Sequence, residues 1–441
     1  INVNANTATT DNLSFQVGSA ISLTANQEDF GSGAGNKSGE TYARATLTAN
    51  NATNNATRNY YIYLDITSNN FEYTTNDNQA ELLLKVTDPD GIEVTNIPGL
   101  TRKTSGGVTG FDITTFTGLI TIADNYEIVS TGTETQEWTV EVIFANLDSD
   151  QNANTGKAFS ATLTIQEEAY EYTLADVCPY GGNLASCIAD LNTLAGDGGG
   201  DLYYHDADLA NGAQDNSYRY SGANPNNYVC FGSNAETCPE DNLYRIIGVF
   251  DGQVKLIKAA SYGSYAWDAD NINSWDETTK PDIYTTLNTT YYNTLGNEWS
   301  DLISLTSWQV GGFSFVGNLE ETFDIEVGTG QSGYEETMKI GLMYASDYGY
   351  GASLEKWTTG LYEENYGTDN WLYLGSDEWL ISRVSNNSSS AFYVSSTNGG
   401  SFSVILVYGS RAIRPSFYLA PTVEFSGGTG TQSDPFTLSI N

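Results

Sequence analysis

The stretch NYYIYLDI, at Asn59–Ile66, decides how the first part of this chain folds. Its even-numbered residues, from Tyr60 to Ile66, are all aromatic or aliphatic, while Asn59 and Asp65 are among the odd-numbered ones. Side chains two residues apart point to the same face of an extended strand, whereas a helix would spread them around its axis. The alternation therefore predicts a β-strand with one buried face.

The same alternation returns in three later stretches, Leu82–Val86, Trp138–Phe144 and Phe159–Ile165. Turn residues such as Asp88–Gly91 (DPDG) and Ile97–Gly99 (IPG) separate them. Strands with one apolar and one polar face, joined by polar turns, are typical of antiparallel β-sandwiches. We expect about eight strands and almost no helix in this part of the chain.

The composition changes near residue 170, which indicates a second kind of domain. Only Trp138 among the 8 tryptophans precedes this point, and all 4 cysteines follow it. Leu184–Ala195 has apolar residues near helical spacing, and the glycine-rich run Gly196–Gly200 ends it. We therefore expect a mainly β protein with an N-terminal extension (1–12), an antiparallel β-sandwich (13–168), a linker with a short helix (169–200) and an irregular α+β domain (201–441).

The second domain has short strand signals separated by long polar loops. Tyr244–Phe250 and Val254–Ile257 flank the hairpin turn Asp251-Gly252. Further strands are expected at Trp371–Leu374, Trp379–Val384, Ala391–Ser395 and Phe402–Tyr408.

The charge balance excludes several classes of partner. The 441 residues include 55 acidic and 17 basic ones, for a net charge of −38. So few cations cannot form a patch that binds a nucleic-acid backbone, and an anionic membrane surface would repel the protein. The apolar stretches are far shorter than the ~18 residues of a membrane-spanning helix. We therefore expect no nucleic acid partner and no membrane span.

The cysteines form two close pairs, Cys178 with Cys187 and Cys230 with Cys238. Neither pair has CxxC spacing, and one histidine does not complete a zinc site, so disulfides are favoured over metal ligation. Three connectivities are open, of which the short spacings favour these two pairs, and free buried thiols are the alternative. Disulfides and a first residue, Ile1, that is not Met lead us to expect a processed, extracellular protein of the cell surface.

No set of residues stands out as catalytic. Hydrolysis needs two carboxylates in a cleft or an activated nucleophile. Neighbouring acids, such as Asp268 with Asp270 or Asp377 with Glu378, are interpreted as solvated loop acids because the chain holds so many. His205 has no GxSxG motif to partner it, so we interpret it as a structural or surface histidine. We expect no catalytic residue and no cofactor.

The run Asp148–Asn154 (DSDQNAN) is similar to the start of a calcium loop. It has Ala153 where the loop needs glycine, and Phe159 where it needs a bidentate glutamate. A polar hairpin loop is favoured over a weak calcium site, and we predict no metal site.

Two further groups of side chains each have two interpretations. Lys85 and Lys157 could form intramolecular cross-links to asparagine, as conceivable in a fibre sandwich, but the sequence assigns them no partner. Exposed tryptophans stack on sugars, whereas buried ones anchor loops in the core. The candidates are Trp267, Trp275, Trp299 and Trp371.

Residues 1–168 resemble the sandwich of the camelysin and TasA group of secreted fibre proteins. The resemblance rests on pattern: a short extended start, the strand Ser19–Thr24 (SAISLT) and Asn59–Ile66. In that group, subunits polymerise when the N-terminal strand of one inserts into the sandwich of the next. The resemblance implies a homopolymer.

The first residues have the pattern that strand insertion requires. Ile1, Val3 and Ala5 alternate with asparagines and precede the polar run Thr7–Asn12. Such a strand would supply backbone hydrogen bonds and fill pockets with alternate side chains. An ordinary first strand or a frayed terminus is the alternative.

Residues from about 200 to 441 resemble a domain common in surface proteins of Gram-positive bacteria, which is similar in pattern to the C-type-lectin and formylglycine-generating-enzyme folds. The matching segments are Leu243–Gly248, Trp379–Arg383, Arg411–Ser416 and Gly428–Leu438. The EPN or QPD tripeptide of C-type lectins is absent, and so is the cysteine pair of the formylglycine-generating enzymes at its matching place. The resemblance therefore implies a C-type-lectin-like fold without implying its chemistry.

Together these observations predict a non-enzymatic subunit of an extracellular filament or pilus-like fibre. Copies would join by donor-strand insertion, and the C-terminal domain would face outward to contact its environment. A monomeric surface adhesin that binds glycan or protein is the alternative, and a carbohydrate-active enzyme is the second alternative.

Overall fold

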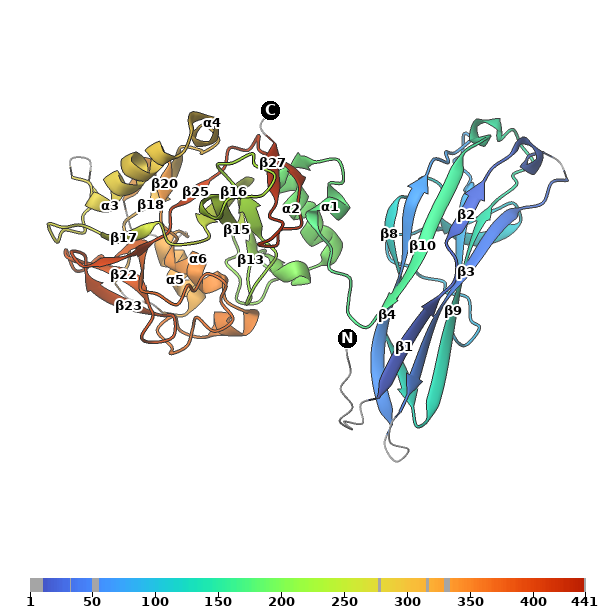
Figure 1. The fold of residues 1–441 in the computed structure, drawn as a ribbon, viewed down its shortest axis with the longest axis horizontal. Coiled ribbons are helices and arrows are strands. Elements are labelled where there is room, and N and C mark those ends of the chain that lie inside the picture. The colour runs from blue at the N-terminus through green and yellow to red at the C-terminus, as the bar shows by residue number, and fades with distance from the viewer. Residues whose placement is uncertain are drawn as a thin grey trace. The chain divides into compact units, whose positions relative to one another are not determined.

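The computed structural model describes residues 11–31, 33–49, 55–276, 279–314, 317–328 and 334–439. The chain divides into two compact units, Ile1–Tyr170 and Glu171–Asn441 (Figure 1). Strands account for 40% of the residues and helices for 15%, which confirms the mainly β prediction of a two-sheet sandwich followed by a mixed α+β region. Among the described residues, no helix combines the length and the apolar character needed to cross a bilayer.

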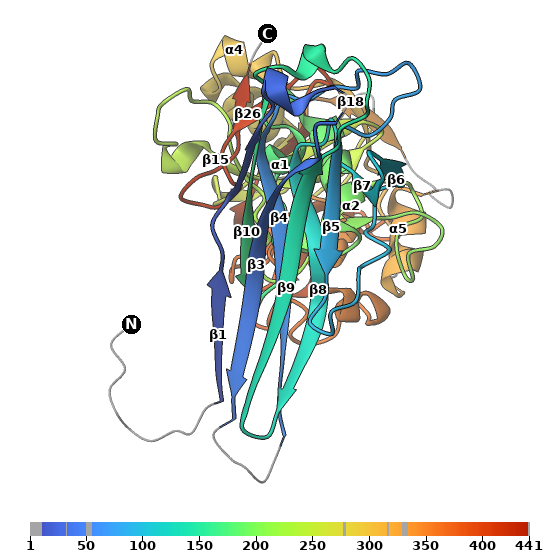
Figure 2. The same ribbon diagram turned by 90° about the vertical axis from the view of Figure 1, so that its right-hand side faces the viewer.

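The first unit consists of two antiparallel sheets, with strand orders β1-β3-β9-β5-β7-β6 and β2-β10-β4-β8. Figure 2 shows β1, β3 and β9 side by side. The strands of the first sheet are β1 (Asn12–Val17), β3 (Lys37–Thr48), β9 (Thr133–Phe144), β5 (Leu82–Thr87), β7 (Val108–Asp112) and β6 (Arg102–Ser105). Those of the second sheet are β2 (Ile21–Thr24), β10 (Ala158–Gln166), β4 (Ala56–Asn69) and β8 (Gly118–Ser130).

The described part of this unit has ten strands, not the eight expected. Strands as short as β2 and β6 carry too few residues for alternation to be detected in the sequence. The first strand, β1, already begins at Asn12, which pairs with Thr48, so the predicted extension 1–12 ends within the sheet.

The predicted alternation places the sandwich core. Tyr60, Ile62, Leu64 and Ile66 are each at most 2% exposed and lie in one hydrophobic cluster. Trp138 joins them from β9, and its Nε1 donates to Tyr60 Oη at 3.0 Å. A buried indole and a buried phenol thus satisfy each other.

The second unit is built around two larger sheets, with orders β12-β13-β15-β16-β25-β20 and β17-β24-β21-β22-β23. In the first of these, β14 also pairs with β15, and two small sheets, β11-β26-β27 and β18-β19, complete the unit. The strands are β11 (Gly182–Asn183), β12 (Leu202–Tyr204), β13 (Tyr218–Tyr220), β14 (Tyr228–Cys230), β15 (Leu243–Phe250), β16 (Gln253–Lys258), β17 (Gly263–Ala266), β18 (Thr306–Gln309), β19 (Glu335–Met338), β20 (Ile340–Gly341), β21 (Glu378–Arg383), β22 (Ser390–Ser395), β23 (Ser401–Leu406), β24 (Ser410–Ile413), β25 (Ser416–Tyr418), β26 (Glu424–Gly427) and β27 (Thr437–Ser439). The α-helices are α1 (Leu174–Val177), α2 (Leu184–Ala195), α3 (Asp282–Thr285), α4 (Asn297–Ser300), α5 (Leu319–Glu326) and α6 (Ala345–Tyr350).

The helix α2 has the bounds that its sequence predicts. The side chain of Asn183 accepts a hydrogen bond from Ser186 N at 3.1 Å, and Gly196 ends the helix with a φ of 77°. Its apolar face, which includes Ile188 and Leu191, is buried in the core of the second unit. Residues 171–200 therefore group with this unit, because the apolar face of an amphipathic helix needs a core to cover it.

One predicted strand, Trp371–Leu374, is a turn. Asn370 holds it closed, because its Oδ1 accepts from Leu372 N and its carbonyl from Tyr373 N, both at 3.0 Å. Because the N–H groups of Leu372 and Tyr373 bond to Asn370, they are not available for pairing with a neighbouring strand.

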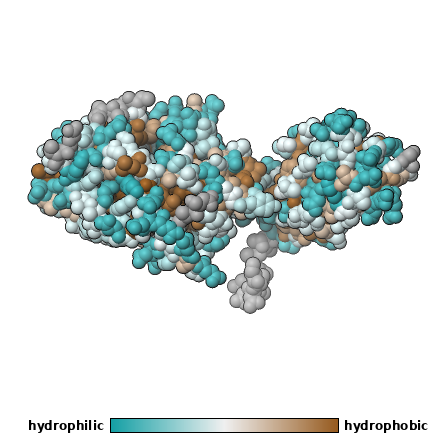
Figure 3. Space-filling model, turned by 90° about the horizontal axis from the view of Figure 1, so that it is seen from above, coloured by the Kyte–Doolittle hydropathy of each residue, from teal (hydrophilic) through white to brown (hydrophobic). Residues whose placement is uncertain are grey.

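Two arginines from the motif segments lie in the core of the second unit. Arg414 is 1% exposed and forks onto Glu378, with Nε at 2.7 Å from Oε1 and Nη2 at 3.0 Å from Oε2. Arg245 stacks between Tyr228 and Trp371, with its guanidinium carbon 4.3 and 4.5 Å from the two ring centroids. Glu378 compensates the charge of Arg414 inside the core, and two aromatic rings flank the charge of Arg245. The face of the molecule seen in Figure 3 is mainly hydrophilic, with small hydrophobic patches.

Candidate functional site

The tryptophans named as sugar-stacking candidates do not face solvent. Trp267, Trp275, Trp299 and Trp371 are each at most 6% exposed. Trp267 Nε1 donates to Leu380 O at 3.2 Å and Trp371 Nε1 to Tyr220 O at 2.9 Å. They anchor the core, so these four side chains do not form a sugar-binding surface.

The neighbouring acids do not act as pairs. Asp268 accepts from Ile272 N at 3.0 Å, and Asp377 accepts from Ser396 N at 2.8 Å. Glu378, the neighbour of Asp377, is buried against Arg414. Asp268 and Glu378 are 7% and 2% exposed, so the interpretation as solvated loop acids is wrong for these two.

His205 is a core residue, which excludes the surface interpretation. It is 0% exposed, its Nδ1 accepts from Ala213 N at 3.0 Å, and its ring lies against Tyr350 and Trp357 at centroid distances of 4.8 and 5.0 Å. Burial, with a smaller effect of the nearby Arg219 charge, holds the pKa of His205 well below its ordinary value.

Side chains of the loop Asp148–Asn154 form hydrogen bonds within the protein. Gln151 is 0% exposed and donates to Ala145 O at 2.9 Å, and Asn154 Nδ2 donates to Glu72 O at 2.9 Å. Within the residues that the structure describes, no group of three or more His, Cys, Asp or Glu side chains could hold a metal ion.

The structure joins Cys178 to Cys187 and Cys230 to Cys238, the pairs that the short spacings favour. The two sandwich lysines form ion pairs with glutamates: Lys157 Nζ lies 2.8 Å from Glu72, and Lys85 Nζ lies 3.8 Å from Glu93. No asparagine side chain is bonded to either lysine in the described contacts.

The proposed polymerisation residues Ile1, Val3 and Ala5 lie outside the described residues. The described sandwich nevertheless has a strand edge that bears on them. β2 pairs with β10 only at Ala158–Ala161, whereas β4 pairs with the other side of β10 as far as Gln166. Among the described residues, no strand pairs with Thr162–Gln166 on the β2 side, and we call this open edge the β10 slot.

The β10 slot borders incompletely covered apolar side chains. Ile165 on β10, and Leu13 and Phe15 on β1 of the opposite sheet, pack against the sandwich core but stay partly exposed. The equivalent residues of the inner strand β3, such as Ala45 and Leu47, are 0% exposed. The slot is therefore a place where a further strand would bury apolar surface.

A cavity with a volume of about 770 Å³ lies in the second unit. At its floor, Asp347 of α6 accepts from Lys255 Nζ of β16 at 2.6 Å and from Tyr344 N at 2.8 Å. Arg219 of β13 approaches from the other side, with Nη1 3.8 Å from Asp347 Oδ1. Arg219 also binds Asp215, at 2.5 Å.

The floor is thus a chain of alternating charges, Asp215–Arg219–Asp347–Lys255, in which the last three side chains are at most 3% exposed. Burial alone raises the pKa of Asp215, but Arg219 and Ser217 outweigh it and leave that pKa below its ordinary value. Burial lowers the pKa of Arg219, and Asp215 and Asp347 more than reverse this effect. The chain of four side chains contains two acids and two bases, so it is neutral as a whole, and each buried charge has a partner of opposite sign.

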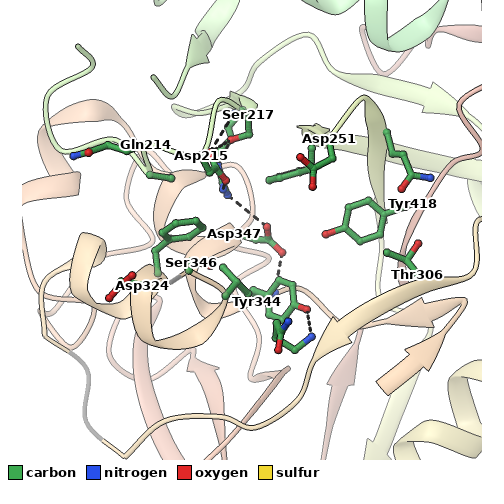
Figure 4. A pocket seen from close by; sticks show the side chains of 18 of the residues that line it. Gln214, Asp215, Ser217, Asp251, Thr306, Asp324, Tyr344, Ser346, Asp347 and Tyr418 are labelled. Atoms are coloured by element: carbon green, nitrogen blue, oxygen red, sulfur yellow. Dashed lines mark hydrogen bonds and ion pairs between the residues drawn. The ribbon is translucent and has the colours of Figure 1, made fainter. Parts of the chain in front are cut away.

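Aromatic rings and neutral polar groups form the walls of the cavity. The guanidinium of Arg219 lies 4.6 Å from the Phe250 centroid, and Lys255 Nζ lies 4.3 Å from that of Tyr344. Figure 4 shows Thr306 and Tyr418 on one side of the cavity and Asp215 and Asp324 on the other, with Asp347 between them.

This cavity has the features of a binding site. Its volume is within the range of roughly 300–1,000 Å³ that is usual for small-molecule pockets. Two serine hydroxyl groups of the lining donate to carboxylates, Ser217 to Asp215 at 2.6 Å and Ser346 to Glu326 at 2.8 Å. The arrangement can hold a ligand between fixed dipoles and rings.

Sequence reasoning did not find the cavity residues, although one signal was present. Lys255 stands between aliphatic residues in the strand QVKLIK, and a charged side chain in a buried strand requires a buried partner. Its partner Asp347 is 92 positions away, so the sequence alone could not name it.

No protein-family model, no curated protein and no solved structure matches this chain.

Proposed function

We propose that this protein is the subunit of an extracellular filament in which the first residues of one copy pair with the β10 slot of the next. The observation that carries the proposal is the open edge at Thr162–Gln166, beside the partly exposed side chains of Leu13 and Phe15. An unpaired strand edge is a template for another strand, and proteins that do not use such an edge normally cover or charge it. The slot, with the sequence TLTIQ, carries no charged residue.

The length and pattern of the first residues suit this edge. The segment Ile1–Ala5 has as many residues as the slot, and Ile1, Val3 and Ala5 would fill one face of it. Ten uncharged residues, INVNANTATT, precede the first charged one, Asp11.

The absence of charge in both segments matters in a subunit of charge −38, because neighbouring copies repel each other. Pairing two uncharged segments keeps the joint free of local repulsion. At the end of the slot, Arg58 lies 3.7 Å from Asp11 and 3.8 Å from Glu167, which compensates the nearest acids. We expect assembly to strengthen with ionic strength, since salt screens the remaining repulsion.

Both disulfides support the extracellular part of the proposal, because such bonds persist in oxidising compartments. In the filament the second unit would face outward, where its cavity is accessible to ligands.

The assembly is tested by two matched substitutions in the proposed donor segment. Val3→Asp places a charge on the face that would enter the slot, and Asn4→Asp places the same charge on the opposite face. We expect electron micrographs to show filaments of the Asn4→Asp protein and monomers of the Val3→Asp protein. A protein without residues 1–10 should be monomeric and should bind a synthetic peptide of that sequence.

Filaments formed equally by both variants would contradict the proposal. A monomeric native protein whose slot is filled by its own first residues would also contradict the proposal. In that case the peptide would bind the truncated protein but would not bind the native protein at any concentration.

A further inference from the structure

Two buried oxygen atoms of residues that line the cavity of the second unit, Thr306 Oγ1 and Gln309 Oε1, have no hydrogen-bond partner among the described residues. Both residues belong to β18, at the wall of the cavity. A buried polar atom left unsatisfied costs about 1–3 kcal/mol, and a native structure seldom keeps one without a purpose. These two oxygen atoms call for a ligand that brings hydrogen-bond donors.

The charges of the cavity restrict the ligand. The buried carboxylate of Asp347 is compensated by Lys255 and Arg219, so an added cation finds no unpaired buried charge. The exposed acids Asp251 and Glu320 at the rim repel anions. The ligand that fits this distribution is neutral.

The shape of the cavity restricts it further. The rings of Phe250 and Tyr418 are partly exposed in the wall, so they offer apolar faces beside the polar atoms of β18. A molecule that carries C–H faces and many hydroxyl groups matches such a wall, because each hydroxyl both donates and accepts. Between Arg219 Nη1 and Asp347 Oδ1, which are 3.8 Å apart, one hydroxyl could accept from the first and donate to the second.

We propose that this cavity binds a neutral saccharide. The site differs from the tryptophans considered above, all of which are buried, and it does not depend on the assembly of the first unit. Binding would give the outward-facing unit a ligand whether the protein is a filament subunit or a monomer.

The proposal is tested on the full-length protein with a neutral-glycan array, followed by calorimetric titration at physiological salt. The probes in the titration are the best neutral glycan from the array, chitopentaose, its de-acetylated cationic form and tetragalacturonic acid. We expect the neutral probe to bind most tightly. Thr306→Val should weaken it roughly three- to tenfold, the worth of one hydrogen bond, without lowering thermal stability.

Thr337→Val is the control, because Thr337 is an exposed threonine of the neighbouring strand β19 that pairs with Ser307 and does not line the cavity. Its affinity should stay at the native value. The proposal is overturned if no neutral glycan binds, if the cationic or anionic probe binds more tightly, or if the two valine variants lose affinity equally.

Discussion

At the scale of single residues, the buried imidazole of His205 makes stability depend on pH. Burial holds the pKa of His205 in the folded protein well below the 6.5 of an ordinary histidine. As the pH falls below 6.5, the imidazole therefore stays neutral in the folded protein while the unfolded chain takes up a proton. The neutral imidazole therefore makes its full contribution to stability above pH 6.5, the pKa of the unfolded chain. That contribution is lost as the pH falls below 6.5, because the unfolded state then binds more protons than the folded state. Asparagine at this position keeps an acceptor for Ala213 N but cannot titrate.

We therefore predict that the native protein loses about 1.4 kcal/mol more than His205→Asn when the pH is lowered from about 7.5 to 5.5. Urea unfolding at both values measures the difference, and the carboxylates shared by the two proteins cancel. Parallel pH profiles would contradict the prediction, because they would show that the histidine titrates alike in the folded and unfolded states.

At the scale of elements, one side chain fastens the start of α2. Asn183 Oδ1 accepts from Ser186 N at 3.1 Å, and its Nδ2 donates to Pro421 O at 2.6 Å. Asn183→Ala removes both bonds and should lower the free energy of unfolding by about 2 kcal/mol, while Asn183→Ser keeps the cap and should cost about 1 kcal/mol. Thr193→Ala, on the exposed face of the same helix, serves as the control within about 0.5 kcal/mol. An Asn183→Ser protein as stable as the native one would deny any role to the Pro421 contact, and equal losses from both Asn183 variants would deny any role to the cap.

The same helix shows what a sequence can predict here. Its ends are set by local groups, the cap at Asn183 and the glycine at Gly196, so its bounds followed from neighbouring residues. The alternation of Tyr60, Ile62 and Leu64 likewise placed the sandwich core. Local signals act over a few positions, and they were sufficient for these elements.

The cavity and the slot could not be predicted because they depend on contacts between distant segments. Thr306 and Asp347 line the same cavity only once the sheets have formed. The open edge of β10 exists because β2 begins only at Ile21, opposite Ala161, and nothing in the TLTIQ stretch indicates where its neighbouring strand begins. Strand pairing is a tertiary property, so the sequence predicts the strand but not its missing partner.

At the scale of the whole molecule, the two units have separate cores and unequal covalent support. The two large hydrophobic clusters share no residue, and both disulfides belong to the second unit. We predict two calorimetric transitions. A reducing agent should lower only the transition of the second unit, because each small disulfide loop contributes about 2–3 kcal/mol. A single transition that shifts as a whole on reduction would show that the units unfold together.

The unequal distribution of tryptophan has a spectroscopic consequence. Seven of the 8 indoles belong to the second unit, and all are shielded from solvent, while Trp138 alone lies in the sandwich with Tyr126 edge-on at 4.9 Å. Tryptophan fluorescence therefore comes almost entirely from the second unit and reports little about unfolding of the sandwich. A red shift of the emission would report the opening of the second unit, and a protein reduced to Trp138 would turn the same instrument into a probe of the first.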